Sequence, residues 1–224
     1  MNKVEAVIFD MDGVIFDTEK VYLENWRRVF KKYGYKMTKE IYISVMGRGR
    51  KNVIKTFLEV YGEDLPIVQM YKEKDELFMQ EIEEGKVPIK QGVEEILDFL
   101  KENKCKIAIA TSAKRNRTMN QLNVTGITQK FDVIVCGDEI TNSKPDPEIF
   151  LKAAQKLSVN HSNCIVIEDS PVGIKAAFNA KMVGIHVEDL KKADDEILKY
   201  CYRSSKNLFE VKEYFENNRN KMFK

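Results

Sequence analysis

The stretch Val4-Glu5-Ala6-Val7-Ile8-Phe9-Asp10-Met11-Asp12-Gly13 decides how the rest of the chain is interpreted. Its mostly apolar run from Val4 to Phe9 has the length and composition of a buried β-strand. Asp10 follows this run directly, and Asp12 comes two residues later. In an open parallel sheet, ligands bind outside the carboxyl ends of the strands. We therefore expect both acids to face a ligand at that edge.

Four later apolar runs have a similar length, and they cover residues 106–110, 131–136, 164–167 and 182–187. Between these runs, residues 92–103 and 147–157 place their apolar side chains on one helical face. Ser170-Pro171 and Asp146-Pro147 each have the form of an N-cap followed by proline at the first helical position. Alternating apolar strands and helices predict an α/β fold, a doubly wound parallel sheet that is covered on both faces.

The alternation is interrupted once, between the first and second strands. About ninety residues lie there, far more than a crossover connection needs. They are themselves helical in pattern: residues 52–60 and 67–82 predict helices, and one apolar stripe contains Tyr22, Trp26, Val29 and Tyr33. We predict an inserted α-helical cap at residues 17–85 and a catalytic core formed by residues 1–16 and 86–224. The stripe around Trp26 is interpreted as the interior of the cap.

The composition excludes several classes of function. There are 37 basic and 35 acidic residues, so the net charge of +2 gives no general reason to bind nucleic acid or a membrane. No apolar run reaches about eighteen residues, and the first residues do not form a signal peptide, so a cytoplasmic protein is expected. The four cysteines contain no Cys-x-x-Cys pair, and only two histidines are present. The cysteine spacing therefore argues against a zinc site, and the scarcity of histidines argues against a Ser-His-Asp mechanism.

Polar residues follow several of the predicted strands, which should bring them to one edge of the sheet. Besides Asp10 and Asp12, these residues are Thr111, Ser112, Lys144, Glu168 and Asp169. Clustered carboxylates are unfavourable unless a cation shares the site, and oxygen ligands completed by water suit Mg²⁺. Hydroxyl groups and a lysine suit a phosphoryl group. The constellation therefore predicts Mg²⁺-dependent phosphoryl chemistry.

The same residues resemble the four signature motifs of the haloacid dehalogenase superfamily. The motifs follow one another in the order typical of that superfamily and extend across the whole predicted core. The motifs are Asp10-Met11-Asp12-Gly13-Val14, Thr111-Ser112, Lys144-Pro145-Asp146-Pro147 and Glu168-Asp169-Ser170-Pro171-x-Gly173. The resemblance implies a Rossmann-like core and a small phosphorylated metabolite as the substrate. The early helical cap is similar to the branch, subfamily I, that contains sugar-phosphate phosphatases and β-phosphoglucomutase.

The resemblance also implies a role for each motif residue. Asp10 would be the nucleophile that becomes an aspartyl-phosphate, and Asp12 would be the general acid and base. Phosphoryl oxygens would be bound by Thr111 and by the backbone beside Ser112, with Lys144 neutralising charge. The Mg²⁺ ligands would be Asp10, Asp169, the backbone carbonyl of Asp12 and, directly or through water, Glu168. Asp146 and Ser170 are interpreted as helix caps.

The choice between hydrolase and mutase depends on the cap. In the basic cluster 48–51, Arg50 falls near the arginine that grips the distal phosphate in β-phosphoglucomutase, and Lys74 falls near the mutase's cap lysine. The mutase has a histidine in its first cap helix, where this chain has Tyr22. We therefore favour a phosphatase of a sugar phosphate over a β-phosphoglucomutase-like enzyme. The basic cluster could equally be a solvated helix start.

A signalling receiver domain also combines aspartates, a Thr or Ser and a lysine around Mg²⁺. Such domains are shorter and have no place for a cap, so this alternative is disfavoured.

Near the C-terminus, Lys199-Tyr200-Cys201-Tyr202 only loosely resembles the short strand that the family usually adds. Residues 217–224 are expected to be frayed, and a monomer is expected from the resemblance.

Overall fold

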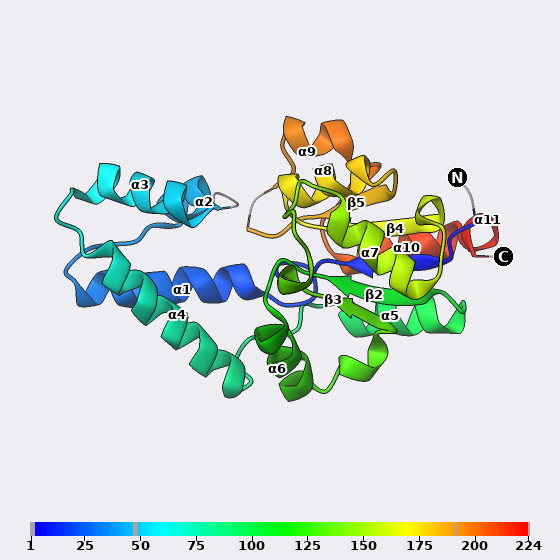
Figure 1. Cartoon of the computed structure of the whole chain (residues 1–224), viewed down its shortest axis with the longest axis horizontal. Helices are drawn as coiled ribbons and strands as arrows, with labels where there is room; N and C mark the ends of the chain where they lie inside the picture. The colour runs from blue at the N-terminus through cyan, green and yellow to red at the C-terminus, as the bar shows by residue number, and fades with distance from the viewer. Residues whose placement is uncertain (1–2, 47–48, 191, 224) are drawn as a thin grey trace.

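The computed structural model describes residues 3–46, 49–190 and 192–223. Its centre is a parallel sheet of six strands in the order β3-β2-β1-β4-β5-β6. The first strand, β1, therefore lies inside the sheet between β2 and β4 (Figure 1). The strands are β1 (Ala6–Phe9), β2 (Lys106–Ala110), β3 (Val133–Val135), β4 (Cys164–Glu168), β5 (Val183–Val187) and β6 (Arg203–Ser205).

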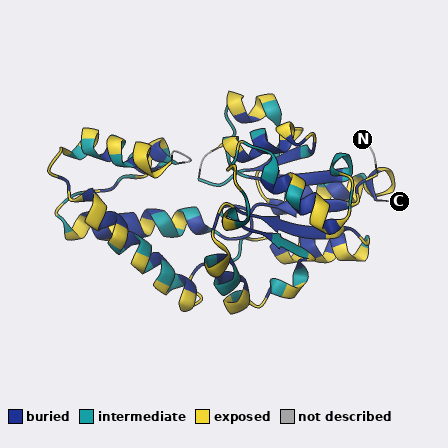
Figure 2. Cartoon of the chain, in the orientation of Figure 1, coloured by how far each residue is buried: buried dark blue, intermediate teal, exposed yellow. Residues whose placement is uncertain are grey.

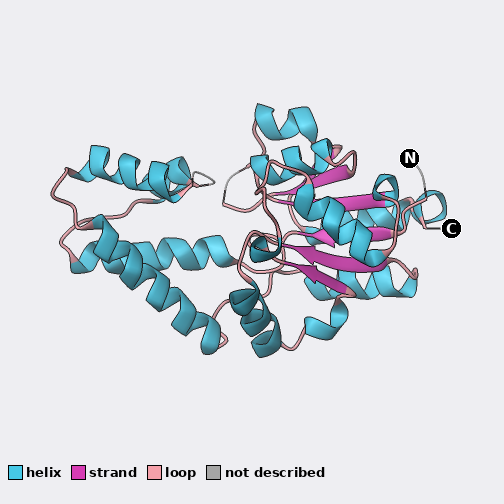
Figure 3. Cartoon of the chain, in the orientation of Figure 1, coloured by secondary structure: helices cyan, strands magenta, loops and turns pink. Residues whose placement is uncertain are grey.

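Helices cover both faces of this sheet (Figure 3), and the strands bury alternate residues against each layer. Val7 and Phe9 of β1 belong to the cluster formed with α5 (Val93–Glu102) and α10 (Leu208–Asn217). Ala6 and Ile8 belong to the cluster formed with α7 (Glu148–Leu157) and α8 (Pro171–Asn179). A strand buried on both faces must be apolar at successive positions, which explains the continuous run around β1.

Four helices between β1 and β2 extend away from the sheet (Figure 1). They are α1 (Thr18–Lys32), α2 (Lys39–Val45), α3 (Arg50–Tyr61) and α4 (Ile67–Glu83). We call residues 17–85 the cap and the rest the core, as the sequence predicts. The cap has its own apolar cluster, in which Trp26 packs edge-on against Phe30, Phe57 and Tyr71. The cap thus has an interior of its own, visible as buried inner faces in Figure 2.

The two connections between cap and core lie side by side. Phe16 and Ile89 form an antiparallel bridge, flanked by hydrogen bonds from Asp17 N to Pro88 O and from Lys90 N to Ile15 O. The Lys90 side chain donates to Gly13 O at 2.6 Å and to Asp189 Oδ1 at 2.8 Å. The entry and exit of the cap are therefore fastened to each other and to the loop that follows β1.

Most sequence predictions for the core are confirmed by the structure. All five predicted strands are present, and Ser170 caps α8 by accepting from Gly173 N, with Pro171 at the first position. The other proposed cap differs, because α7 has Pro147 itself at the N-cap while Asp146 accepts from Glu148 N. Within the described residues, no helix has both the length and the apolar character needed to cross a membrane.

The C-terminal segment differs in two places from what its sequence suggests, and the expectation of a frayed tail is wrong. Residues 199–202 do not form the last strand, because α9 (Asp195–Tyr200) occupies part of this stretch and β6 begins at Arg203. The tail is not frayed either: α11 (Arg219–Met222) buries Met222, and Phe223 packs against Phe99 and Phe215. Val4 N also donates to Met222 O at 2.7 Å, so the tail is hydrogen-bonded to the segment that precedes β1.

Phe223→Ala should therefore lower the free energy of unfolding by about 2–3 kcal/mol, since it leaves a cavity between α5 and α10. The measurement is urea unfolding, with Lys221→Ala as the control because Lys221 is exposed in α11, the short helix that Phe223 follows. Equal stability of Phe223→Ala and Lys221→Ala would contradict the packed tail.

Candidate active site

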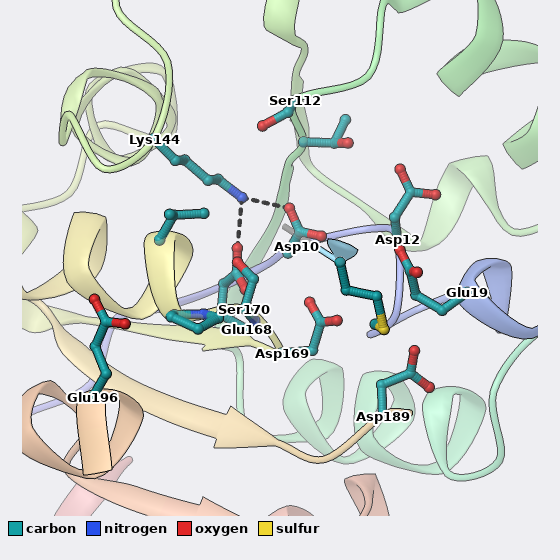
Figure 4. A pocket seen from close by; sticks show the side chains of 14 residues that line it. Asp10, Asp12, Glu19, Ser112, Lys144, Glu168, Asp169, Ser170, Asp189 and Glu196 are labelled. Carbon is teal, nitrogen blue, oxygen red and sulfur yellow. Dashed lines mark hydrogen bonds and ion pairs between the residues drawn. The ribbon is translucent and has the colours of Figure 1, made fainter. Parts of the chain in front are cut away.

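A cavity of about 360 Å³ lies where the carboxyl ends of β1, β2 and β4 meet the cap. Asp10 and Thr111 are the first residues after β1 and β2, and Glu168 is the last residue of β4. Because these strands are parallel and adjacent, their ends deliver the side chains to one place. Figure 4 shows the residues that line the cavity, which include Asp10, Asp12, Thr111, Ser112, Lys144, Glu168 and Asp169. The structure therefore brings together all seven predicted core residues.

The Lys144 ammonium lies at the centre of a buried ion-pair cluster. It contacts Asp10 Oδ1 at 2.5 Å and Glu168 Oε1 at 2.9 Å, and it also donates to Ala110 O at 3.2 Å. Burial disfavours the ammonium, but Asp10 and Glu168 together raise the pKa of Lys144 above its ordinary value. Removing one partner would leave an uncompensated charge in the interior, so the three groups depend on one another.

The carboxylates exceed the charge that Lys144 can neutralise. Burial raises the pKa of Asp10 from 3.8 to about 7, even though Lys144 acts in the opposite direction. Burial, with the charges of Glu168 and Asp10, also raises the pKa of Asp169 well above its ordinary value. Oxygen atoms of Asp10, Glu168 and Asp169 lie within 4.8 Å of one another. Such a group of oxygens with excess negative charge fits a hard divalent cation such as Mg²⁺.

Backbone geometry keeps this centre compact. Gly13 has φ of 79°, and a Cβ atom on it would overlap the carboxyl group of Asp169. A Cβ atom on Gly173, in the first turn of α8, would overlap the carboxyl group of Glu168. Glu168 also accepts from Ser170 N at 2.6 Å, which fixes its second oxygen. The glycines therefore allow the chain to approach the acids closely.

The hydroxyl residues lie on the β2 side of the cavity. Thr111 is buried, and its Oγ1 accepts from Ala113 N at 3.1 Å. Ser112 is exposed at the cavity wall, and a Cβ atom on Gly137 would overlap its carbonyl oxygen. Asp12 lies on the opposite side of Asp10 from Lys144 (Figure 4), and its side chain is paired with Arg117 rather than with the three clustered acids.

Sequence reasoning missed five charged residues in or beside the described part of the site. Glu19, Asp189 and Glu196 line the cavity, while Arg117 pairs with Asp12 and Lys90 pairs with Asp189. Glu19 accepts from the Tyr42 hydroxyl at 2.5 Å. Burial raises the pKa of Glu19 to about 7, which the bond from Tyr42 opposes and the charge of Asp12 reinforces. Each of these residues would be an ordinary solvated charge in isolation, so only its proximity to the strand ends signals a role.

The two predicted cap residues lie outside the described lining of this cavity. Arg50 is exposed, stacks on the Tyr71 ring with 4.3 Å from Cζ to the centroid, and lies 3.7 Å from Asp75. Lys74 is buried, contacts Asp75 at 2.6 Å, and lies 4.4 Å from the Tyr22 ring centroid. Their predicted contact with substrate stays a prediction. Arg48, also in the predicted basic cluster, lies outside the described residues.

Comparison with known families matches residues 7–187 to the haloacid dehalogenase-like hydrolases. The chain belongs to this family. Among relatives, it is 35% identical over 187 residues to a phosphorylated carbohydrates phosphatase from Thermotoga maritima, covering 82% of this chain and 84% of the relative. It is 29% identical to the fructose-1-phosphate phosphatase YqaB from Escherichia coli, covering 81% of this chain and 95% of the relative.

Solved structures agree with this family assignment. The fold is similar to that of a β-phosphoglucomutase from Clostridium difficile, with a TM-score of 0.73 and 33% identity. The alignment covers 97% of this chain and 98% of that structure. The similarity therefore includes the cap as well as the haloacid dehalogenase-like core.

Gly173→Ala should displace Glu168 from Lys144 and lower the free energy of unfolding by at least about 2 kcal/mol. Gly184→Ala is the matched control, because an added Cβ there meets Ala177 at an ordinary 3.5 Å. The measurement is urea unfolding of both variants, and a Gly173→Ala protein as stable as the control would contradict the tight packing against Glu168.

Glu19→Gln should stabilise the protein at alkaline pH but not at acidic pH. Between pH 4.5, the ordinary pKa of the group, and about pH 7, unfolded Glu19 loses its proton while folded Glu19 keeps it. Rising pH therefore reduces the stability of the natural protein, and a neutral glutamine removes this effect. Because Glu19 is partly solvated, we expect a gain of about 1–2 kcal/mol at pH 8.

This prediction is checked by thermal unfolding with a chelator at pH 4 and pH 8. Glu24→Gln, in the same helix but exposed beside Arg27, is the control and should shift stability little at either pH. An equal effect of Glu19→Gln at both pH values would show that the carboxyl titrates normally.

Proposed function

We propose that this protein is a Mg²⁺-dependent phosphatase that hydrolyses a small phosphorylated carbohydrate through an aspartyl-phosphate on Asp10. The observation that carries the proposal is the placement of Asp10, which faces the cavity while Lys144 holds one of its oxygens at 2.5 Å. A second acid, Asp12, lines the same cavity two residues away. Relatives named as phosphatases of phosphorylated carbohydrates and of fructose 1-phosphate support the substrate class.

The first step forms the covalent intermediate. A carboxylate oxygen of Asp10 forms a bond to phosphorus while the bond from phosphorus to the sugar oxygen breaks. Asp12 donates its proton to that departing oxygen, which leaves as an alcohol. Thr111 and the backbone at Ser112 are the donors on the β2 side of the cavity for the phosphoryl oxygens. Lys144 orients Asp10 and offsets the negative charge.

The second step returns the nucleophile. A water oxygen attacks phosphorus, Asp12 takes a proton from this water, and the bond from phosphorus to Asp10 breaks to release inorganic phosphate. Asp10, Asp169 and Glu168 are the side chains that would hold Mg²⁺, with the carbonyl of Asp12 as a further ligand. Bound there, Mg²⁺ would neutralise charge on the phosphoryl group.

A phosphoglucomutase is the second candidate, favoured by the likeness to the Clostridium difficile enzyme and by the buried cap lysine, Lys74. Two observations favour the phosphatase. By the sequence resemblance, Tyr22 falls where the mutase cap has a histidine, and its ring centroid lies 4.4 Å from the Lys74 ammonium. Arg50 pairs with Asp75 and stacks on Tyr71 instead of facing the cavity.

The test is phosphate release from 4-nitrophenyl phosphate and from a panel of sugar phosphates. We expect release that requires Mg²⁺, stops with a chelator, and falls by at least about a thousandfold in Asp10→Asn. Asp98→Asn, an exposed acid paired with Lys130 outside the site, is the matched control and should keep full activity.

Two results would contradict the proposal. Robust phosphate release by Asp10→Asn would exclude Asp10 as the nucleophile. Conversion of hexose 1-phosphate to hexose 6-phosphate without net phosphate release, measured with a coupled assay for the 6-phosphate, would establish the mutase.

A further inference from the structure

Arg117 contacts the side chain of Asp12 from outside the cavity. It lies in α6 (Arg115–Thr125), the core helix that follows the Thr111-Ser112 motif, and its Nη2 donates to Asp12 Oδ1. The pair is largely shielded from water, with side-chain exposures of 18% for Arg117 and 24% for Asp12. Asp12 is among the residues that line the cavity, whereas Arg117 is not among the described lining residues. The guanidinium therefore supports Asp12 from behind.

The cap holds the other side of the same guanidinium. Its Cζ atom lies 4.8 Å from the ring centroid of Phe78, which belongs to α4 and is itself buried. Phe78 packs in turn on Tyr22 of α1, with 4.2 Å between the ring centroids. The helices α4 and α6 contact each other, as Figure 1 shows near the base of the cap. Arg117 is thus enclosed between the candidate acid of the core and an aromatic face of the cap.

The arrangement is more specific than a surface ion pair. A planar guanidinium that stacks on a ring and donates to a carboxylate restricts the orientation of that carboxylate. Arg117 Nε is buried without a hydrogen-bond partner among the described residues, which costs free energy unless another contact of the side chain offsets it. Arg115, two residues earlier in the same helix, has an exposed side chain and pairs with Glu139 at 3.0 Å, so α6 itself does not require a buried arginine.

We propose that Arg117 is a positioning residue that orients Asp12 for proton transfer to the leaving group, and that Phe78 of the cap fixes Arg117 in place. This inference rests on the proposed phosphatase function, in which Asp12 is the proton donor. The leaving oxygen needs a proton within hydrogen-bond reach, so a carboxyl group that rotates freely is a poorer donor. Arg117 does not touch the substrate; it acts through Asp12.

The leaving group of the substrate gives a test that a purely structural role would not pass. A sugar alkoxide is a poor leaving group and depends on the proton from Asp12, whereas 4-nitrophenolate departs without one. We expect Arg117→Ala to lower kcat/KM for the sugar phosphate by about ten- to a hundredfold. For 4-nitrophenyl phosphate the loss should be about threefold or less. The comparison is made within one protein, so a lower fraction of folded enzyme cancels.

Three further variants sharpen the result. Arg115→Ala is the matched control and should leave both substrates unchanged, because that arginine pairs with Glu139 away from Asp12. Arg117→Lys keeps the charge but loses the planar contact. It should therefore recover part of the kcat/KM for the sugar phosphate that Arg117→Ala loses. Phe78→Leu keeps an apolar side chain but removes the ring face. It should also lower kcat/KM more for the sugar phosphate than for 4-nitrophenyl phosphate, but by less than Arg117→Ala does. If Arg117→Ala does not fold, Arg117→Lys and Phe78→Leu carry the same comparison.

Equal losses for both substrates, no loss, or faster turnover of the sugar phosphate by Arg117→Ala would each overturn the assignment. Faster turnover would identify the contact as one that restrains Asp12. These outcomes are distinct from failure of the proposed function, since that failure would appear in the unmodified protein as absent phosphate release from either substrate.

Discussion

The ammonium of Lys144, held between Asp10 and Glu168 inside the sheet edge, is the interaction on which the rest of the site depends. It joins the loop after β3 to the ends of β1 and β4, which are far apart in sequence. Each of these charges would be costly alone in the interior, and removing one partner of such a buried pair costs about 3–5 kcal/mol. The parallel sheet brings these charged groups together because the carboxyl ends of neighbouring strands lie side by side. The negative charge that remains after Lys144 is counted gives the site its fit for a divalent cation.

Much of the core could be predicted from the sequence because buried parallel strands are locally recognisable. The run before Asp10 is apolar at successive positions, since β1 is covered on both faces. The strand β6 was not located from the sequence, because it is a short, polar edge strand, Arg203–Ser205, with no apolar pattern. Burial of Phe223 was missed because it depends on Phe99 and Phe215, whose positions only the folded chain defines. A lysine-rich tail gives no local sign that two of its residues are covered.

For the site, the residues that follow strands were predictable and those on helices were not. Asp10, Thr111 and Glu168 gain meaning from the strand that precedes each of them. Arg117 and Glu19 lie on helices, where a charged residue normally faces water, and their contacts with Asp12 and Tyr42 join segments that are distant in the sequence. The sequence singled out Lys74 for the substrate, and the structure buries it against the aromatic ring of Tyr22, so its contact with substrate stays a prediction. A charge pattern alone does not show whether such a residue is buried or exposed.

The paired connections between cap and core have a mechanical consequence. An appended lid on one flexible linker could rotate about three axes, whereas this insertion enters and leaves through two chain segments joined by the Phe16–Ile89 bridge. Two backbone hydrogen bonds flank that bridge, so twisting or shearing the ribbon would break them, while bending across its width would not. Lys90 ties the same ribbon to Gly13 of the loop that carries Asp12. The ribbon therefore restricts how far the cap can turn relative to the core, and Lys90 fixes the base of the cap to the loop that carries Asp12.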